Sequence, residues 1–364
     1  MCNKGLAVYG LAFNAMISLA RFVLAISVAI FHLHKPVIAP SPSAFVAVLI
    51  FYFISGFVMQ RAIQNYSGKF YKLKFVVNRL LRLLPLLLIF NILGAIKNDN
   101  LKNSILYTTN LGDFSKLTEA GQPKIFLTGI LTGCVPGWSV MIELLFYIFL
   151  VSKIKRFWEN LMIGINLIVI AQGIYLGGAY GFDYIYLNFF GTCAIFILGM
   201  KFSRYIDAGP TNFKVKYLDV AFFGFLGALV LMPYYYRFEI DELLVVAIFS
   251  TVGIFLLALA ILSSAKFSIF REVDNGKSSL DKSRLFQYLG SLSFPLYICH
   301  TYWFESSLYS RIESNLSESM AAVGGKIWAE LFALSVALLI SHILLLIVIR
   351  PIDKIRLKVK QQSA

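Results

Sequence analysis

Residues 12–33 read AFNAMISLARFVLAISVAIFHL, and this stretch decides the fold class. Its side chains are apolar almost throughout, and it is long enough to cross the hydrocarbon layer of a bilayer, which takes roughly 20 helical residues. The start of the chain superficially resembles a signal peptide, but no small-residue cleavage pattern follows the apolar run. We therefore expect a retained membrane helix that carries one charged side chain, Arg21, within its length.

Further apolar stretches of similar length follow the first one. Together they predict about ten transmembrane helices, near residues 12–33, 42–62, 81–97, 137–152, 158–178, 182–200, 217–234, 242–263, 286–305 and 327–349. The composition agrees, because 59% of the 364 residues are hydrophobic and 14% are charged, whereas soluble domains carry about 25% charged residues. We predict an all-α polytopic membrane protein, with one integral-membrane domain over residues 1–364 and no appended soluble domain.

The Lys and Arg residues indicate the orientation of the chain. Most of the 33 basic residues fall in every second connecting segment, including 61–80 and 264–285. Cytoplasmic loops carry such an excess, so the bias places both termini in the cytoplasm. The net charge of +14 is spread in short clusters between apolar runs, and we therefore expect no nucleic-acid partner. The four cysteines show neither paired nor metal-ligand spacing, so we expect no metal site.

Arg21 and His32 lie on the same face of the first helix. The eleven positions between them correspond to a rotation only about 20° larger than three full turns, since each position adds 100°. The two residues are roughly 16 Å apart along the helix axis. A charge inside the bilayer costs about 2.5–3.5 kcal/mol on insertion scales, so Arg21 needs a cavity or a partner. Two interpretations stay open at this point: a functional pair, or a structural arginine with a histidine at the membrane interface.

The sequence WSVMIELLFY at residues 138–147 places a carboxylate, Glu143, inside a membrane helix. Glu143 and Tyr147 are four residues apart and share a helix face. Trp138 suits an anchor at the membrane interface, with Ser139 beside it. A carboxylate at this depth needs a partner, which is either a catalytic group or a structural arginine.

A third motif, GSLSFPLYICH at residues 290–300, puts polar side chains on one stripe of a helix. Ser293, Tyr297 and His300 stand at positions i, i+4 and i+7. His300 comes near the outer end, at a depth comparable with that of His32. Such residues also hold membrane helices together by hydrogen bonds. Two interpretations therefore remain open, a functional site and a structural contact between helices.

Arg79 and Arg82 lie three residues apart where the third predicted helix enters the membrane from the inner side. A pair of guanidinium groups is well suited to bind phosphate. The excess of positive charge on cytoplasmic loops is an alternative reason for arginines at this place.

These motifs together resemble the acyltransferase family 3 membrane proteins, which O-acylate cell-surface sugars in bacteria and related substrates elsewhere. The resemblance runs across nearly the whole chain. It comprises Arg-x10-His at Arg21 and His32, Ser-Gly-Phe at Ser55, Gly56 and Phe57, Arg-x-x-Arg with a following proline at Arg79, Arg82 and Pro85, the Trp-Ser box at Trp138, Ser139, Glu143, Phe146 and Tyr147, and the Ser-Tyr-His box at Gly290, Ser293, Phe294, Tyr297 and His300.

The chain departs from the family pattern in three places. Ser18 stands where the family often has an acidic residue, and Phe294 replaces the usual tyrosine. Ile349-Arg350-Pro351 stands where the family often has Glu-Arg-Pro or Glu-Lys-Pro. The soluble esterase-like domain of some members is not expected here. These departures concern the acceptor and its delivery and leave the class of the protein unchanged.

The resemblance implies an O-acyltransferase of the bacterial inner membrane that moves an acyl group, expected to be acetyl from acetyl-CoA. The acceptor would be a hydroxyl of lipopolysaccharide, exopolysaccharide, peptidoglycan or a lipid-linked oligosaccharide, and no cofactor would be bound permanently. Arg79 and Arg82 would hold the phosphates of the donor, and His32 would deprotonate the acceptor hydroxyl. Glu143 would either orient His32 or pair with Arg21. The cavity around them would be lined by Trp138, Ser139, Tyr147, Ser293, Tyr297 and His300.

Two other classes of protein fit some of these features. A transporter or flippase of a glycan precursor would use intramembrane Arg, Glu and His as substrate contacts, but the internal repeats common in transporters are not seen. A glycosyltransferase with an outer catalytic loop would favour acidic residues in the first outer loop, and residues 34–41 contain none.

Overall fold

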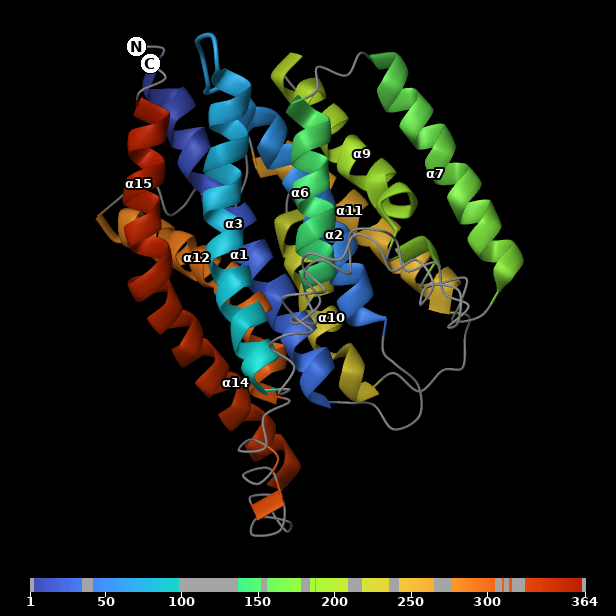
Figure 1. Ribbon diagram of the computed structural model, residues 1–364, viewed down its shortest axis with the longest axis vertical. Helices are drawn as coiled ribbons and strands as arrows, with labels where there is room; N and C mark the ends of the chain where they lie inside the picture. The colour runs from blue at the N-terminus through green and yellow to red at the C-terminus, as the bar shows by residue number, and fades with distance from the viewer. Residues whose placement is uncertain are drawn as a thin grey trace.

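The computed structural model describes residues 3–34, 42–97, 137–151, 156–177, 184–186, 188–208, 218–235, 242–264, 277–304, 310, 314–315 and 325–361. Within these ranges the long elements are all helices and no strand occurs. They form one bundle (Figure 1). Its helices are α1 (Asn3–His34), α2 (Ser43–Ile63), α3 (Tyr71–Lys97), α6 (Gly137–Val151), α7 (Arg156–Leu176), α9 (Phe189–Ala208), α10 (Leu218–Tyr235), α11 (Glu242–Ser264), α12 (Lys277–Phe304), α14 (Gly325–Leu344), η4 (Leu345–Ile349) and α15 (Arg350–Gln361).

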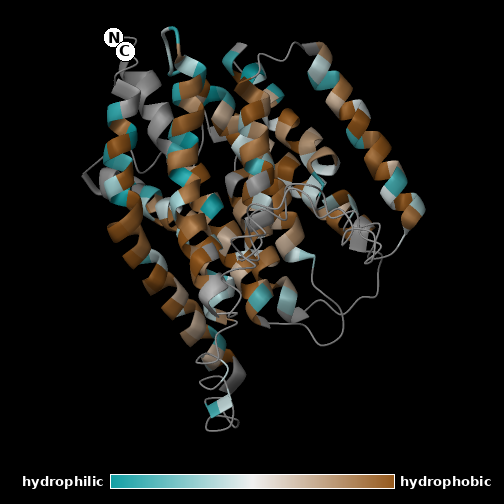
Figure 2. Ribbon diagram, in the orientation of Figure 1, coloured by the Kyte–Doolittle hydropathy of each residue, from teal (hydrophilic) through white to brown (hydrophobic). Residues whose placement is uncertain are grey.

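The length and hydropathy of these helices suit a bilayer. In the part of the chain that the structure describes, 6 helical stretches are long and apolar enough to cross a membrane: Asn14–Leu33, Ser43–Ile63, Phe157–Leu176, Phe189–Asp207, Leu244–Leu262 and Ile327–Lys358. Two shorter apolar stretches, Ile142–Val151 and Val220–Pro233, lie in α6 and α10. Hydrophobic residues predominate along the helices (Figure 2). The prediction of an all-α polytopic membrane protein is thereby confirmed.

Several helices extend beyond the apolar stretches from which they were predicted. Helix α3 begins at Tyr71 instead of near residue 81, and α12 begins at Lys277 instead of near residue 286. Hydropathy marks only the lipid-covered part of a helix, so polar turns that continue it outside the bilayer are missed. The start of α1 and the end of α15 lie at the same end of the bundle (Figure 1), as an even number of crossings requires.

Helix α1 is the central helix of the bundle, packed against α12, α2 and α10. One of its faces is formed by buried apolar residues four positions apart, Met16, Ala20, Leu24 and Val28. This period places the four residues on a single stripe of the helix. Because α1 is enclosed in this way, a charged residue on it faces protein and not lipid. That position explains how Arg21 is accommodated within a membrane span.

Helices α2 and α9 pack so closely that their backbones touch. A Cβ atom added to Gly56 would lie 2.1 Å from the carbonyl oxygen of Phe196, and one added to Gly199 would lie 2.2 Å from that of Phe53. Small residues allow such close approach between membrane helices. This contact fixes the height of α2, which carries Ser55 next to Gly56, relative to the rest of the bundle.

Replacing Gly56 with alanine is therefore expected to destabilise the protein. The added methyl group must push α2 and α9 apart, and overpacking of this kind costs about 1–3 kcal/mol. The measurement is the thermal unfolding temperature of the protein in detergent. The control is Gly224→Ala on α10, where nothing lies within 4 Å of the added atom. An unfolding temperature equally unchanged in both variants would contradict the close contact.

Candidate functional site

A cavity lies between α1, α2, α6 and α12, near the middle of the bundle. It holds about 450 Å³ of space between atoms, counting its open mouth, and is lined by Arg21, Val48, Phe51, Tyr52, Ser55, Ser139, Val140, Glu143, Ser293, Phe294 and Tyr297. Five residues that the sequence indicated as functional, Arg21, Ser139, Glu143, Ser293 and Tyr297, thus meet around one space. They come from three separate motifs, so the bundle brings together side chains that are far apart in the chain.

Glu143 is held at the wall of this cavity by two hydroxyl groups. The Oγ atom of Ser55 donates a hydrogen bond of 2.8 Å to its Oε1 atom, and the hydroxyl of Tyr147 donates to the same oxygen. The charge of Glu143 also acts on the guanidinium of Arg21. A carboxylate away from water needs such donors and a nearby positive charge. Of the two partners considered from the sequence, Arg21 therefore lines the same cavity and is within reach of the charge of Glu143, and the pairing itself stays a prediction.

Ser55 was not among the residues expected to form the site, although it belongs to the Ser-Gly-Phe motif. A serine in an apolar helix commonly bonds to its own backbone, so its presence alone did not indicate a contact with a carboxylate. The one indication in the sequence was that Ser55 belongs to the Ser-Gly-Phe motif at residues 55–57. The neighbouring Gly56 sets the close packing of α2 on α9 and thereby places Ser55.

A second pair of hydroxyl groups joins α6 to α12 across the cavity. Ser139 Oγ and the hydroxyl of Tyr297 are 2.6 Å apart, and either can donate. The hydroxyl of Tyr52 donates to the carbonyl oxygen of Ser139 at 3.5 Å. Ser293 also lines the cavity and donates its own proton to the carbonyl oxygen of Gly290 at 2.7 Å, so toward a ligand its oxygen can act as an acceptor.

Two histidines meet beyond the cavity, toward the end of the bundle far from the termini. The ring centroids of His32 and His300 are 5.1 Å apart, and Tyr297 lies 6.0 Å from His300. His300 is fully buried, and its Nδ1 atom is 3.1 Å from the carbonyl oxygen of Leu296. Because a carbonyl only accepts, Nδ1 carries the proton, and Nε2 is the acceptor atom of the neutral ring. Nε2 has no hydrogen-bond partner among the described residues.

Arg79 and Arg82 do not line the cavity but lie on its other side, toward the end of the bundle that holds the termini. Both of their charges act on Arg21. Arg79 is buried, and its guanidinium carbon lies 5.3 Å from the centre of the Phe75 ring. Arg21 thus stands between the arginine pair and the cavity, while His32 stands beyond the cavity. The side chain of Trp138 lies outside the described part of the structure, whereas Tyr147 is buried next to Glu143.

A close contact between helices α1 and α12 lies one turn before Arg21. A Cβ atom added to Gly290 would lie 2.5 Å from the Cβ atom of Ser18 and 2.8 Å from its Cα atom. Helices α1 and α12 therefore touch at this point, three residues before Arg21. The contact is made by the Cα and Cβ atoms of Ser18, which any residue but glycine would share, so it requires a glycine at position 290 and leaves the serine in place of the family's frequent acidic residue without a structural explanation.

Comparison with known proteins gives one match. A family model described as an acyltransferase domain, that of acyltransferase family 3, matches residues 14–347. Neither the curated proteins nor the solved structures contain a match to the chain. The matched range includes each of the five motifs and all the side chains described above.

Proposed function

The chain belongs to acyltransferase family 3, and from this premise we propose that it transfers an acetyl group from acetyl-CoA to a hydroxyl of a cell-surface or lipid-linked saccharide. Family membership gives a membrane O-acyltransferase as the class of protein. The donor, the acceptor and a location in a bacterial cytoplasmic membrane are the proposed parts.

The observation that carries the proposal is the order of the polar side chains along the bundle. Arg79 and Arg82 lie toward the end that holds the termini, Arg21 and Glu143 line the cavity, and the His32–His300 pair lies beyond it. The loop charges predict that the end with the termini is cytoplasmic, where acetyl-CoA is available. This order supports entry of the donor from one side of the membrane and of the acceptor from the other.

His32 is the proposed general base. In the reaction a ring nitrogen of His32 takes the proton of the acceptor hydroxyl as the oxygen bonds to the thioester carbonyl carbon. The C–S bond then breaks, its electron pair leaves with the sulfur of the donor, and the thiolate takes up the proton. An imidazole suits this step because its ordinary pKa is close to neutral pH, so the ring can both take up and release a proton.

The developing negative charge on the carbonyl oxygen needs hydrogen-bond donors or positive charge fixed before the reaction. The hydroxyl of Tyr297, whose ring lies 6.0 Å from that of His300, can donate a hydrogen bond to this oxygen. The guanidinium of Arg21, about three helical turns from His32, adds positive charge from the opposite wall of the cavity. Glu143, held by Ser55 and Tyr147, keeps Arg21 in place. Phe51 and Phe294 give the same cavity apolar walls that suit the pantetheine arm and the acyl group.

The experiment that tests this function uses purified protein in lipid nanodiscs, with acetyl-CoA labelled in its acetyl group and a set of bacterial surface glycans as acceptors. We expect the label to appear in a glycan as an ester that mild alkali releases. A protein that moves unmodified glycan across the membrane and never incorporates label would show a transporter instead. Failure to label any acceptor with folded protein would count against the donor or the acceptor class.

A further inference from the structure

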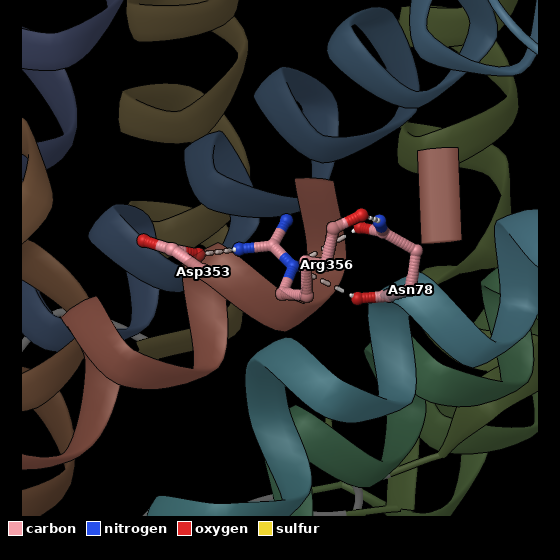
Figure 3. Close-up of polar contacts among 3 residues, drawn as sticks. All are labelled: Asn78, Asp353 and Arg356. Carbon is pink, nitrogen blue, oxygen red and sulfur yellow. Dashed lines mark hydrogen bonds and ion pairs between the residues drawn. The ribbon is translucent and has the colours of Figure 1, made fainter. Parts of the chain in front are cut away.

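Helix α15 brings a third arginine to the pair formed by Arg79 and Arg82. The helix packs against α3, and Arg356 and Asn78 bind each other reciprocally (Figure 3). Arg356 Nε donates to the carbonyl oxygen and to Oδ1 of Asn78, at 3.1 and 3.0 Å, and Asn78 Nδ2 donates to the carbonyl oxygen of Arg356 at 3.0 Å. Asn78 directly precedes Arg79 and is about one helical turn from Arg82. These bonds therefore fix the Arg356 guanidinium beside the pair.

The three guanidinium groups share an excess of positive charge. The charge of Arg82 acts on both Arg79 and Arg356, and that of Arg356 acts on Arg79. Asp353, which pairs with Arg356, is the one carboxylate among the described residues whose charges act on Arg79 and Arg356. Like charges in a partly buried place repel one another more strongly than in water. An anion carrying more than one negative charge would relieve this repulsion.

Some of the donor atoms of these arginines have no hydrogen-bond partner among the described residues. The Nε atom of Arg79 is buried without a hydrogen-bond partner in the part of the chain that the structure describes. Arg356 uses Nε for Asn78 and Nη1 for Asp353, and its bonds to the described residues do not involve Nη2. Guanidinium N–H groups in fixed positions bind phosphate oxygens well, often two at a time.

A wide helical turn sets the direction in which α15 presents Arg356. The segment η4 (Leu345–Ile349) is π-helical, and the backbone N–H of Arg350 bonds to the carbonyl oxygen of Leu345, five residues back. Pro351 follows and has no N–H to continue the ordinary pattern. One extra residue in a turn rotates everything after it by about 100°. Such turns are frequent at functional sites, and this one directs Arg356 toward α3.

We propose that Arg356 completes, with Arg79 and Arg82, a three-arginine site for the phosphates of the donor coenzyme. The inference rests on the proposed function and extends it to α15, which contributes a binding residue from outside the predicted spans. The nucleotide end of coenzyme A carries a diphosphate and a 3′-phosphate. These negatively charged groups can offset the excess positive charge of the three arginines.

The test is the variant Arg356→Gln, compared with Lys354→Gln, which removes one positive charge from an exposed position of the same helix. Both are assayed in nanodiscs without anionic lipid, so that a lipid headgroup does not supply the anion. For Arg356→Gln we expect KM for acetyl-CoA to rise at least tenfold with kcat within about twofold of the unaltered enzyme. Lys354→Gln is expected to change neither constant by more than about twofold.

Direct binding separates this inference from the proposed function. Adenosine 3′,5′-bisphosphate, the nucleotide fragment of the donor, is titrated into purified protein by calorimetry, which needs no turnover. We expect binding to the unaltered protein and at least tenfold weaker binding to Arg356→Gln. An active enzyme whose KM and nucleotide affinity are both unchanged by Arg356→Gln would overturn the inference and leave the function standing. Nucleotide binding without any acetyl transfer would leave the site standing and overturn the function.

Discussion

Replacing His32 with alanine is expected to lower kcat for acyl transfer by about 10²–10⁴-fold, the usual contribution of a general base. His32 lies on α1 beyond the cavity and contacts the ring of His300. Alanine cannot accept the proton of the hydroxyl, whereas the arginines proposed to bind the donor lie at the other side of the cavity and are unchanged. We therefore expect KM for acetyl-CoA to change by less than about threefold. The measurement is transfer of labelled acetyl to glycan by equal amounts of purified enzyme.

His34→Ala is the matched control for this prediction. It removes an imidazole from the same end of α1, at a position about 200° around the helix from His32. We expect its activity to stay within about twofold of the unaltered enzyme. Full activity of His32→Ala would exclude His32 as the base and make His300 the first alternative, because its Nε2 atom is an acceptor without a partner among the described residues.

Much of this site could be predicted from the helical period of the sequence. The period put Arg21 and His32 on one face of α1, and in the bundle Arg21 lines the cavity while His32 meets His300. It also put Glu143 and Tyr147 on one face, and they are hydrogen-bonded. Contacts within a helix depend on spacing alone, and spacing can be read from one chain.

The contacts between helices could not be predicted in the same way. Whether Glu143 meets Arg21 or His32 depends on the height at which α6 stands beside α1, and this height is set by packing. The part of Ser55 in holding Glu143 depends on the contact between Gly56 and Phe196 on a third helix. Backbone approach of this kind depends on both helices at once, so no local pattern indicates it.

The role of α15 was missed for a different reason. The apolar stretch ends at Ile349 and a proline follows, which ordinarily indicates the end of a helix. The structure continues the helix to Gln361, because the π-helical turn accommodates the missing N–H of Pro351. Arg356 therefore belongs to an element that hydropathy does not mark, although its contact with Asn78 places it next to a motif that the sequence did show.

Glu143→Gln is expected to lower kcat/KM by at least 100-fold while the protein remains folded. Glutamine keeps the size of the side chain and an oxygen that can accept from Ser55 and Tyr147. It removes the negative charge that acts on Arg21. Leaving a buried charge without its partner costs about 3–5 kcal/mol, so Arg21 should shift or draw in water or an anion. The measurements are kcat/KM for acetyl-CoA and the unfolding temperature of the purified variant.

The double variant Arg21→Gln/Glu143→Gln decides whether the carboxylate acts through Arg21. If Glu143 serves to hold Arg21, the double variant should be more stable than Glu143→Gln alone, because no unbalanced charge remains, and about as inactive. Glu159→Gln is the matched control, since Glu159 is buried and pairs with Arg204 at 2.6 Å on α7 and α9, away from the cavity. That variant should lose stability and keep its kcat. Equal stability of the single and double site variants would contradict the pairing, and Glu143 would then act on the reactants themselves.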